Sequence, residues 1–343
     1  MDLTRRQLIA GAVGGGATVG SGGALYNVVL GYDRVTGTNL LRQDLDPMVA
    51  DGFHPSETHV ATVDGYRIEQ REGVLSVREA GTDGDPVATL DPATDGPADA
   101  AAVDADLGLT DGPLEELVAD LGAIAVGDVR FVYDSYPAFF DLIADREPRP
   151  YTVSAVRGYR DADPELVGDF ADADPRDPKA VAEGLVGGFR EHTSYDIERY
   201  LAGSVEDNVL FGARDLRKHF ESETDFEAIL AGEDTGLFCY ELTRRSVDAL
   251  QAVPAPEQTA PVVAGFVKDD RHKHIYTIVA SAVRGRAGGG EGESETGELI
   301  VPVTFLDYTH STLYDDLRMR RILGEGLDAY GDRHRATGIY WYR

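Results

Sequence analysis

Apolar and polar residues alternate along four short segments near the start of the chain. These segments are His59–Val63, Tyr66–Gln70, Val74–Arg78 and Pro86–Leu90. A period of two is typical of a strand with one buried face. Asp64-Gly65 and Glu72-Gly73 lie between the first three segments, and such pairs favour tight hairpin turns. The pattern therefore predicts a small antiparallel β module over residues 57–91.

The spacing of apolar residues changes after residue 112. The spacing of apolar residues and the types of residue present predict helices over Leu114–Ala125, Pro178–Glu191, Tyr195–Glu221, Ala231–Val253 and Leu313–Tyr330. Apolar runs predict strands over Pro261–Val267, His274–Val283, Leu299–Leu306 and Gly338–Tyr342. Helical segments followed by consecutive strands indicate the α+β fold class, in a domain covering residues 113–343.

Polar stretches separate these parts. Residues 32–56 are interpreted as a stalk, and residues 92–112, which are mostly Asp, Ala, Gly and Pro, as an exposed acidic linker. Pro164–Arg176 is interpreted as an acidic loop, and Gly288–Gly297 as a flexible loop between two of the later strands.

The first 31 residues have the layout of a targeting signal. Arg5 and Arg6 lie in a short basic segment, and a Gly/Ala/Val run follows from Leu8 to about Gly31. The basic segment resembles a twin-arginine export signal, which implies export of an already folded chain. An uncleaved membrane anchor and a released protein fit this pattern equally. We therefore expect a cell-surface, membrane-tethered or secreted protein.

The chain is strongly acidic, with a formal net charge of -29 and only four Lys residues. Such a charge repels phosphate backbones and anionic membrane surfaces, so we expect no nucleic-acid partner. Disorder is disfavoured because 42% of the residues are hydrophobic. Dispersed carboxylates with scarce Lys and Cys are typical of a halophile's protein.

The chain has one cysteine, so it forms no disulfide within itself, and that thiol is a candidate for chemistry. Cys239 lies at the expected start of a helix, where unpaired amides favour a reactive thiol and could bind an oxyanion. His274 begins a predicted strand and shares a face with Tyr276 and Ile278. Asp307 ends the next apolar run. Along the chain, Cys239 as nucleophile is followed by His274 as base and by Asp307 as a carboxylate that orients the base.

Each of these three residues also has an ordinary structural interpretation. A free Cys is often a small buried hydrophobe. His272 and His274 could be surface residues of a charged turn, and His272 could replace His274 as the base. Asp307 could simply begin a turn before Tyr308 and Thr309.

The three motifs together resemble the transglutaminase-like superfamily of papain-type cysteine enzymes. Gly236-Leu-Phe-Cys239-Tyr-Glu-Leu, His274-Ile-Tyr-Thr-Ile-Val and Phe305-Leu-Asp307-Tyr-Thr309 carry the resemblance, which covers roughly residues 178–310. It implies a Cys-bearing helix packed on an antiparallel sheet. It also implies a hydrolase or acyltransferase of protein or peptide amides, with Cys239 as nucleophile, His274 as base and Asp307 as its orienting group. We expect no cofactor.

Two other functions remain open. The chain could be a non-catalytic cell-surface binding or structural protein that keeps the same fold. It could also be a metal-dependent hydrolase built on His272 and His274, with Asp270, Asp307 and His310 as further donors.

The acidic composition predicts dependence on salt. Removing salt lengthens the Debye screening distance from about 3 Å at 1 M to about 30 Å at 0.01 M, so repulsion between carboxylates grows. We expect loss of compact structure on dialysis to low salt, followed by circular dichroism. A spectrum that does not change with salt would contradict the halophile interpretation.

Overall fold

The computed structural model describes residues 40–56, 58–158, 162–195, 225–232, 236–237, 239–270, 274–285, 297–309 and 334–341. These ranges leave out the predicted export signal, His272, His310, nearly all of Tyr195–Glu221 and the whole helix predicted over Leu313–Tyr330. In the part of the chain that is described, no helix is both long enough and apolar enough to cross a membrane.

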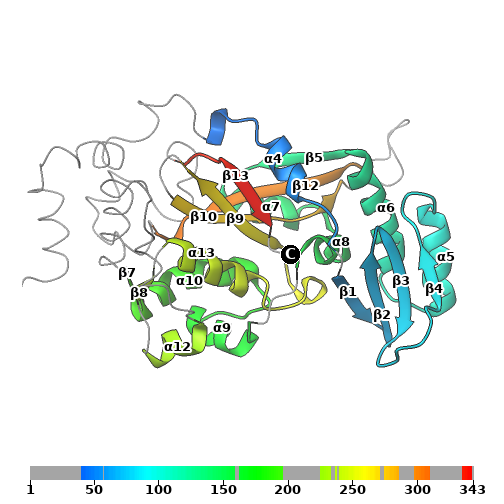
Figure 1. Ribbon diagram of the computed structural model, residues 1–343, viewed down its shortest axis with the longest axis horizontal. Helices are drawn as coiled ribbons and strands as arrows, with labels where there is room; N and C mark the ends of the chain where they lie inside the picture. The colour runs from blue at the N-terminus through cyan, green and yellow to red at the C-terminus, as the bar shows by residue number, and fades with distance from the viewer. Residues whose placement is uncertain are drawn as a thin grey trace, which may run out of the picture.

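The fold is α+β, as the sequence predicts (Figure 1). The described residues form a seven-stranded sheet in the order β13-β9-β10-β12-β11-β6, and β5 pairs with β12. Its strands are β5 (Val129–Tyr133), β6 (Glu147–Pro148), β9 (Val263–Asp269), β10 (His274–Ala280), β11 (Val283–Arg284), β12 (Leu299–Leu306) and β13 (Gly338–Trp341). All pairs are antiparallel except β12 with β5.

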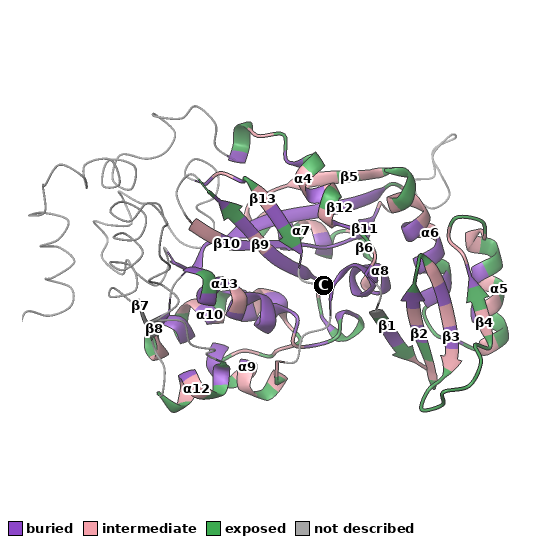
Figure 2. Ribbon diagram, viewed as in Figure 1, coloured by how far each residue is buried: buried purple, intermediate pink, exposed green. Residues whose placement is uncertain are grey.

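The β module also forms as predicted. Strands β1 (Thr58–Val63), β2 (Tyr66–Arg71), β3 (Val74–Glu79) and β4 (Ala88–Leu90) make an antiparallel meander. In both tight turns, Asp64-Gly65 and Glu72-Gly73, the two residues have positive φ. Positive φ at both central residues is typical of the hairpin turns that match strand twist. β2 alternates between buried and more exposed residues, whereas β12 is buried throughout (Figure 2).

The acidic linker predicted over residues 92–112 is instead largely a helix, α5 (Pro97–Leu107). Pro97 occupies the first turn, and the Asp99 carboxylate accepts the Gly96 N–H at 3.0 Å. Asp104, at the end of α5, accepts the Leu114 N–H at the start of α6 (Pro113–Val126). The acidic residues that suggested a linker therefore cap helices, which composition alone does not reveal.

Two further interpretations are wrong for the described residues. The stalk predicted over 32–56 includes α4 (Asp46–Gly52), and Leu40, Val49 and Phe53 are buried against the main sheet. The acidic loop predicted over Pro164–Arg176 contains α9 (Pro164–Ala171). Asp163 caps α9 by accepting the Glu165 N–H, so here too an acidic residue begins a helix.

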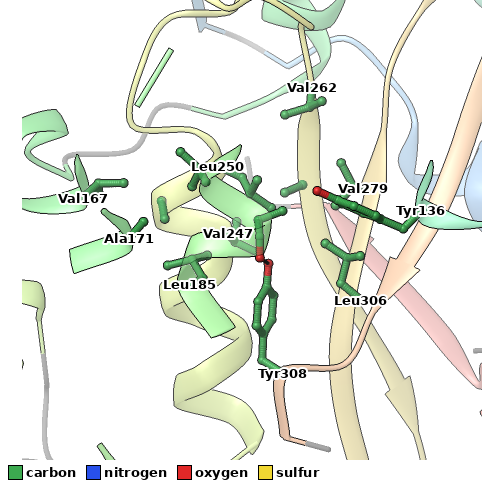
Figure 3. Packing of buried hydrophobic residues seen from close by; sticks show 14 of the residues in the cluster. Tyr136, Val167, Ala171, Leu185, Val247, Leu250, Val262, Val279, Leu306 and Tyr308 are labelled. Carbon is green, nitrogen blue, oxygen red and sulfur yellow. Dashed lines mark hydrogen bonds between the residues drawn. The ribbon is translucent and has the colours of Figure 1, made fainter. Parts of the chain in front are cut away.

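Helices cover both faces of the main sheet. One face packs against α7 (Tyr136–Ala144) and α13 (Cys239–Leu250). α10 (Pro178–His192) packs against α13, and α9 and α12 (Phe226–Ala231) extend the same hydrophobic cluster away from the sheet. Figure 3 shows Val247 and Leu250 of α13 facing Val279 of β10 and Leu306 of β12. The opposite face packs against α4 and against Val153 and Val156 of α8 (Pro150–Val156).

A buried ion network joins α6 to this sheet. Asp120 is fully buried, and its two carboxylate oxygens accept hydrogen bonds from Arg284 at 2.6 Å and Arg149 at 2.8 Å. Thr152 donates to the same carboxylate at 2.7 Å. Removal of one partner would leave a buried charge without compensation, so this network fixes how α6, α8 and β11 meet.

Beside this network, the buried carboxyl group of Glu116 makes the stability of the fold depend on pH. Its carboxylate accepts the Thr152 N–H at 2.8 Å, and burial raises the pKa of Glu116 to about 7. Because the pKa of Glu116 is higher in the folded than in the unfolded state, its protonated form favours the fold. This stabilisation is complete below about pH 4.5 and is lost as pH rises through about 7. We expect Glu116→Gln to remove up to about 3 kcal/mol of pH-dependent stability across this window.

The measurement is urea unfolding of wild type and Glu116→Gln from pH 5 to pH 8 at constant salt. The difference between their free energies of unfolding should change with pH in favour of the variant at higher pH. A difference that stays constant across the window would contradict this role for Glu116.

Candidate active site

Two polar contacts fix the Cys-bearing helix α13 against strand β10. The Ser246 hydroxyl lies 2.6 Å from the Thr277 hydroxyl, and both side chains are buried. Thr243 donates to the Ile275 carbonyl at 3.3 Å. Thr277 and Val279 therefore face α13, whereas Tyr276 and Ile278 belong to the core on the other side of the sheet. These contacts fix α13 relative to the strand that His274 begins.

Cys239 is the first residue of α13 and is buried, with 4% of its surface exposed. Just before it, β8 (Gly236–Leu237) pairs in parallel with β7 (Ser194–Tyr195). Residues 233–235 and Phe238, which precede Cys239, lie outside the described residues. α13 thus begins at Cys239, as the sequence predicts, whereas the helix predicted over Ala231–Val253 is wrong at Gly236–Leu237, which form the strand β8.

Strand pairing brings His274 and Asp307 together. β10 and β12 are antiparallel with Thr277 opposite Leu306, so the first residue of β10 and the residue after β12 lie at the same end of the sheet. There, His274 Nε2 lies 2.9 Å from Asp307 Oδ2. Asp307 is 2% exposed, and its other oxygen, Oδ1, accepts the Thr309 N–H at 2.9 Å.

The His274 ring is also in contact with Cys239. A carboxylate only accepts hydrogen bonds, so His274 Nε2 carries the hydrogen that Asp307 holds. Each ring nitrogen makes one in-plane hydrogen bond, so the bond between His274 and the Cys239 side chain falls to Nδ1. The structure thus aligns thiol, imidazole and carboxylate in the order that the sequence suggests.

The pKa of His274 responds to both neighbours. Burial is the largest single influence on the pKa of His274 and lowers it. The negative charge and hydrogen bond of Asp307, followed by the hydrogen bond and charge of Cys239, outweigh burial and raise this pKa well above its usual value. The contacts therefore favour a charged imidazole beside the thiol.

A fourth residue, His334, joins this group and is absent from the sequence-based prediction. His334 Nε2 lies 2.8 Å from the same oxygen, Asp307 Oδ2, and His334 is 2% exposed. It precedes β13, which pairs with β9. In the sheet, β10 lies between β9 and β12, the strand that Asp307 follows. No spacing in the sequence links residue 334 to residue 307, so only the fold reveals the contact.

The segment that carries His334 is held by the N-terminal part of the chain. Leu40 N–H donates to the His334 carbonyl at 2.9 Å, and the Gln43 side chain makes two 2.8 Å hydrogen bonds with the Ala336 backbone. The Tyr276 hydroxyl donates to the Arg335 carbonyl at 2.9 Å. The residues that we expected to form a stalk therefore help to place His334.

The metal donors suggested by the sequence are only partly brought together. The ligand atoms of His274, Asp307 and His334 all lie within 4.8 Å of one another, whereas Cys239 is not part of this group. Asp270 forms an ion pair with Lys268 at 2.9 Å. His272 and His310 lie outside the described residues.

Bulky neighbours of the site differ in their exposure. Tyr308 is buried, packs against Phe189 and donates to the Ala182 carbonyl at 3.2 Å, so it belongs to the helical core. Tyr240 is 41% exposed. The His274 side chain retains 15% exposure, which makes it the most accessible member of the aligned group.

Comparison with known proteins assigns the chain to no family. No protein-family model, no curated protein and no solved structure matches the chain.

The Ser246–Thr277 contact generates a stability prediction. Ser246→Ala leaves the buried Thr277 hydroxyl without this partner, which should cost about 1–3 kcal/mol. Ser246→Ala combined with Thr277→Val replaces both polar groups with apolar ones and should unfold nearer to wild type. A double-mutant cycle, measured by urea denaturation, gives the coupling energy between Ser246 and Thr277. If the losses in free energy of unfolding of the two single variants add up to that of the double variant, a direct contact is contradicted.

Proposed function

We propose that this protein is an exported or membrane-tethered cysteine hydrolase or acyltransferase of transglutaminase-like type that acts on protein or peptide amides. The alignment of Cys239, His274 and Asp307 is the observation that carries the proposal. A thiol beside an imidazole, which a buried carboxylate orients, is the arrangement that activates a nucleophile.

In the proposed reaction, the Cys239 thiolate attacks an amide carbonyl and forms a carbon–sulfur bond. The carbon–nitrogen bond then breaks, and His274 Nδ1 gives its proton to the leaving amine. Water or an amine attacks the resulting thioester, and His274 Nδ1 takes the proton of that attacking group. The carbon–sulfur bond breaks and returns the thiolate. Asp307 holds Nε2–H throughout and stabilises the charged ring.

The cellular setting is part of the proposal and rests on the sequence. Arg5 and Arg6 support export by the twin-arginine route, and the net charge of -29 supports a protein adapted to high salt. Protein or peptide substrates outside the membrane suit that location. The β module over residues 58–90 would serve as a docking module for such partners.

The burial of Cys239 favours a second candidate, a non-catalytic cell-surface protein that keeps this fold. With 4% of its surface exposed, the thiol could serve as a small core residue. In that case His274 and Asp307 would stabilise the end of the sheet without turnover.

Alkylation of Cys239 at neutral pH in the presence of a chelator separates the two candidates. For an enzyme, a fluorescent iodoacetamide should label the folded protein rapidly, and Cys239→Ala should abolish labelling. His274→Ala should slow labelling at least tenfold because the thiolate loses its partner. His59→Ala is the control, because His59 lies on β1 and should label as wild type does.

A thiol that reacts only after unfolding would contradict the enzymatic proposal and favour the non-catalytic one. Equal labelling rates in wild type and His274→Ala would exclude His274 as the activating group.

A further inference from the structure

Two imidazoles converge on one carboxylate oxygen at the end of the main sheet. His274 Nε2 and His334 Nε2 lie 2.9 Å and 2.8 Å from Asp307 Oδ2. The alignment with Cys239 uses only one of these imidazoles. His334 comes from a distant part of the chain, and its proximity to Asp307 gives the cluster a donor set that the proposed reaction does not need.

We propose that His274, Asp307 and His334 form a binding site for a divalent transition-metal ion of the zinc class. Two imidazole nitrogens and one carboxylate oxygen are the ligands that such ions take in proteins. The three ligand atoms already lie within 4.8 Å of one another, with Asp307 and His334 buried and His274 partly buried.

The distances fit an ion after a small outward movement. Metal–ligand bonds of 2.0–2.2 Å in a tetrahedral site place two ligand atoms roughly 3.3 Å apart. The two nitrogens are now at hydrogen-bonding distance from Asp307 Oδ2, so each pair would open by about half an ångström. The fourth position of the ion would be left for water.

The surroundings of the ligands restrict their movement. Thr309 N–H donates to the other oxygen of Asp307, Oδ1, and the Tyr276 ring lies beside both imidazoles, with ring centroids 5.9 Å from His274 and 4.6 Å from His334. Tyr276 in turn bonds the carbonyl of Arg335. Ligands that are oriented by a second layer of contacts bind metal more tightly than mobile ones.

The nearby charges also suit a cation. Asp307, which is almost fully buried, supplies one negative charge at the point where its Oδ2 meets the two imidazoles. That carboxylate would offset one of the two charges of the ion in a buried site, where an unbalanced charge is costly.

Metal binding and the proposed reaction exclude each other. His274 Nε2 cannot donate to Asp307 and bind an ion at the same time. The ion would force the ring hydrogen onto Nδ1, which then could not take a proton from water or an amine. The inhibition that follows rests on the proposed function, whereas the metal site itself does not.

The test is metal titration of the chelator-treated full chain, with Zn²⁺ by calorimetry and Co²⁺ by visible absorption. Wild type should bind one ion at this site. His334→Ala should weaken binding at least tenfold, whereas Cys239→Ala and the surface control His59→Ala should bind as wild type does. His334→Gln keeps a hydrogen-bond donor for Asp307 but lacks the imidazole, so it should fold and still lose the ion.

Absence of binding to folded wild type would overturn the metal site. Binding that survives in both His334 variants would identify an adventitious ion only, and binding lost in Cys239→Ala alone would place the ion on the thiol. Alkylation of Cys239 is measured with chelator present, so failure of the metal site and failure of the proposed function give separate results.

Discussion

The end of the main sheet depends on the buried carboxylate of Asp307. It accepts hydrogen bonds from two imidazoles and one backbone amide, and it is almost fully enclosed. A buried negative charge is tolerated only when such partners surround it. Because those partners come from β10, from the turn after β12 and from the segment before β13, one carboxylate fixes three parts of the chain that are distant in sequence.

The rest of the architecture places these parts. α13 packs across the sheet through Val247 and Leu250 and through the Ser246–Thr277 contact, which sets Cys239 beside the first residue of β10. On the other face, α4 and the Gln43 side chain hold the segment that carries His334. The Asp120 network performs a similar role at the far side, where it joins α6 to β11. Apolar packing alone would not fix how these helices, strands and segments lie relative to one another. The buried polar groups fix their relative positions.

Much of this could be predicted from the sequence. Period-two alternation identified the β module, and apolar runs identified β9, β10 and β12. The face shared by His274, Tyr276 and Ile278 followed from strand geometry. Acidic residues misled the interpretation of 92–112 and 164–176, because Asp104 and Asp163 act as helix caps. His334 could not be predicted, since its contact with Asp307 depends on the pairing of β13 with β9 and leaves no local pattern.

Asp307 holds the Nε2–H of both His274 and His334, and the structure around the site depends on this pair of hydrogen bonds. A long-range ¹H–¹⁵N NMR spectrum of the histidine-labelled, chelator-treated protein measures which ring nitrogens carry hydrogen, with His274→Ala and His334→Ala providing the assignments. We expect a hydrogen on Nε2 of both rings wherever the protein is folded. A neutral ring with its hydrogen on Nδ1 alone, in either residue, would contradict it.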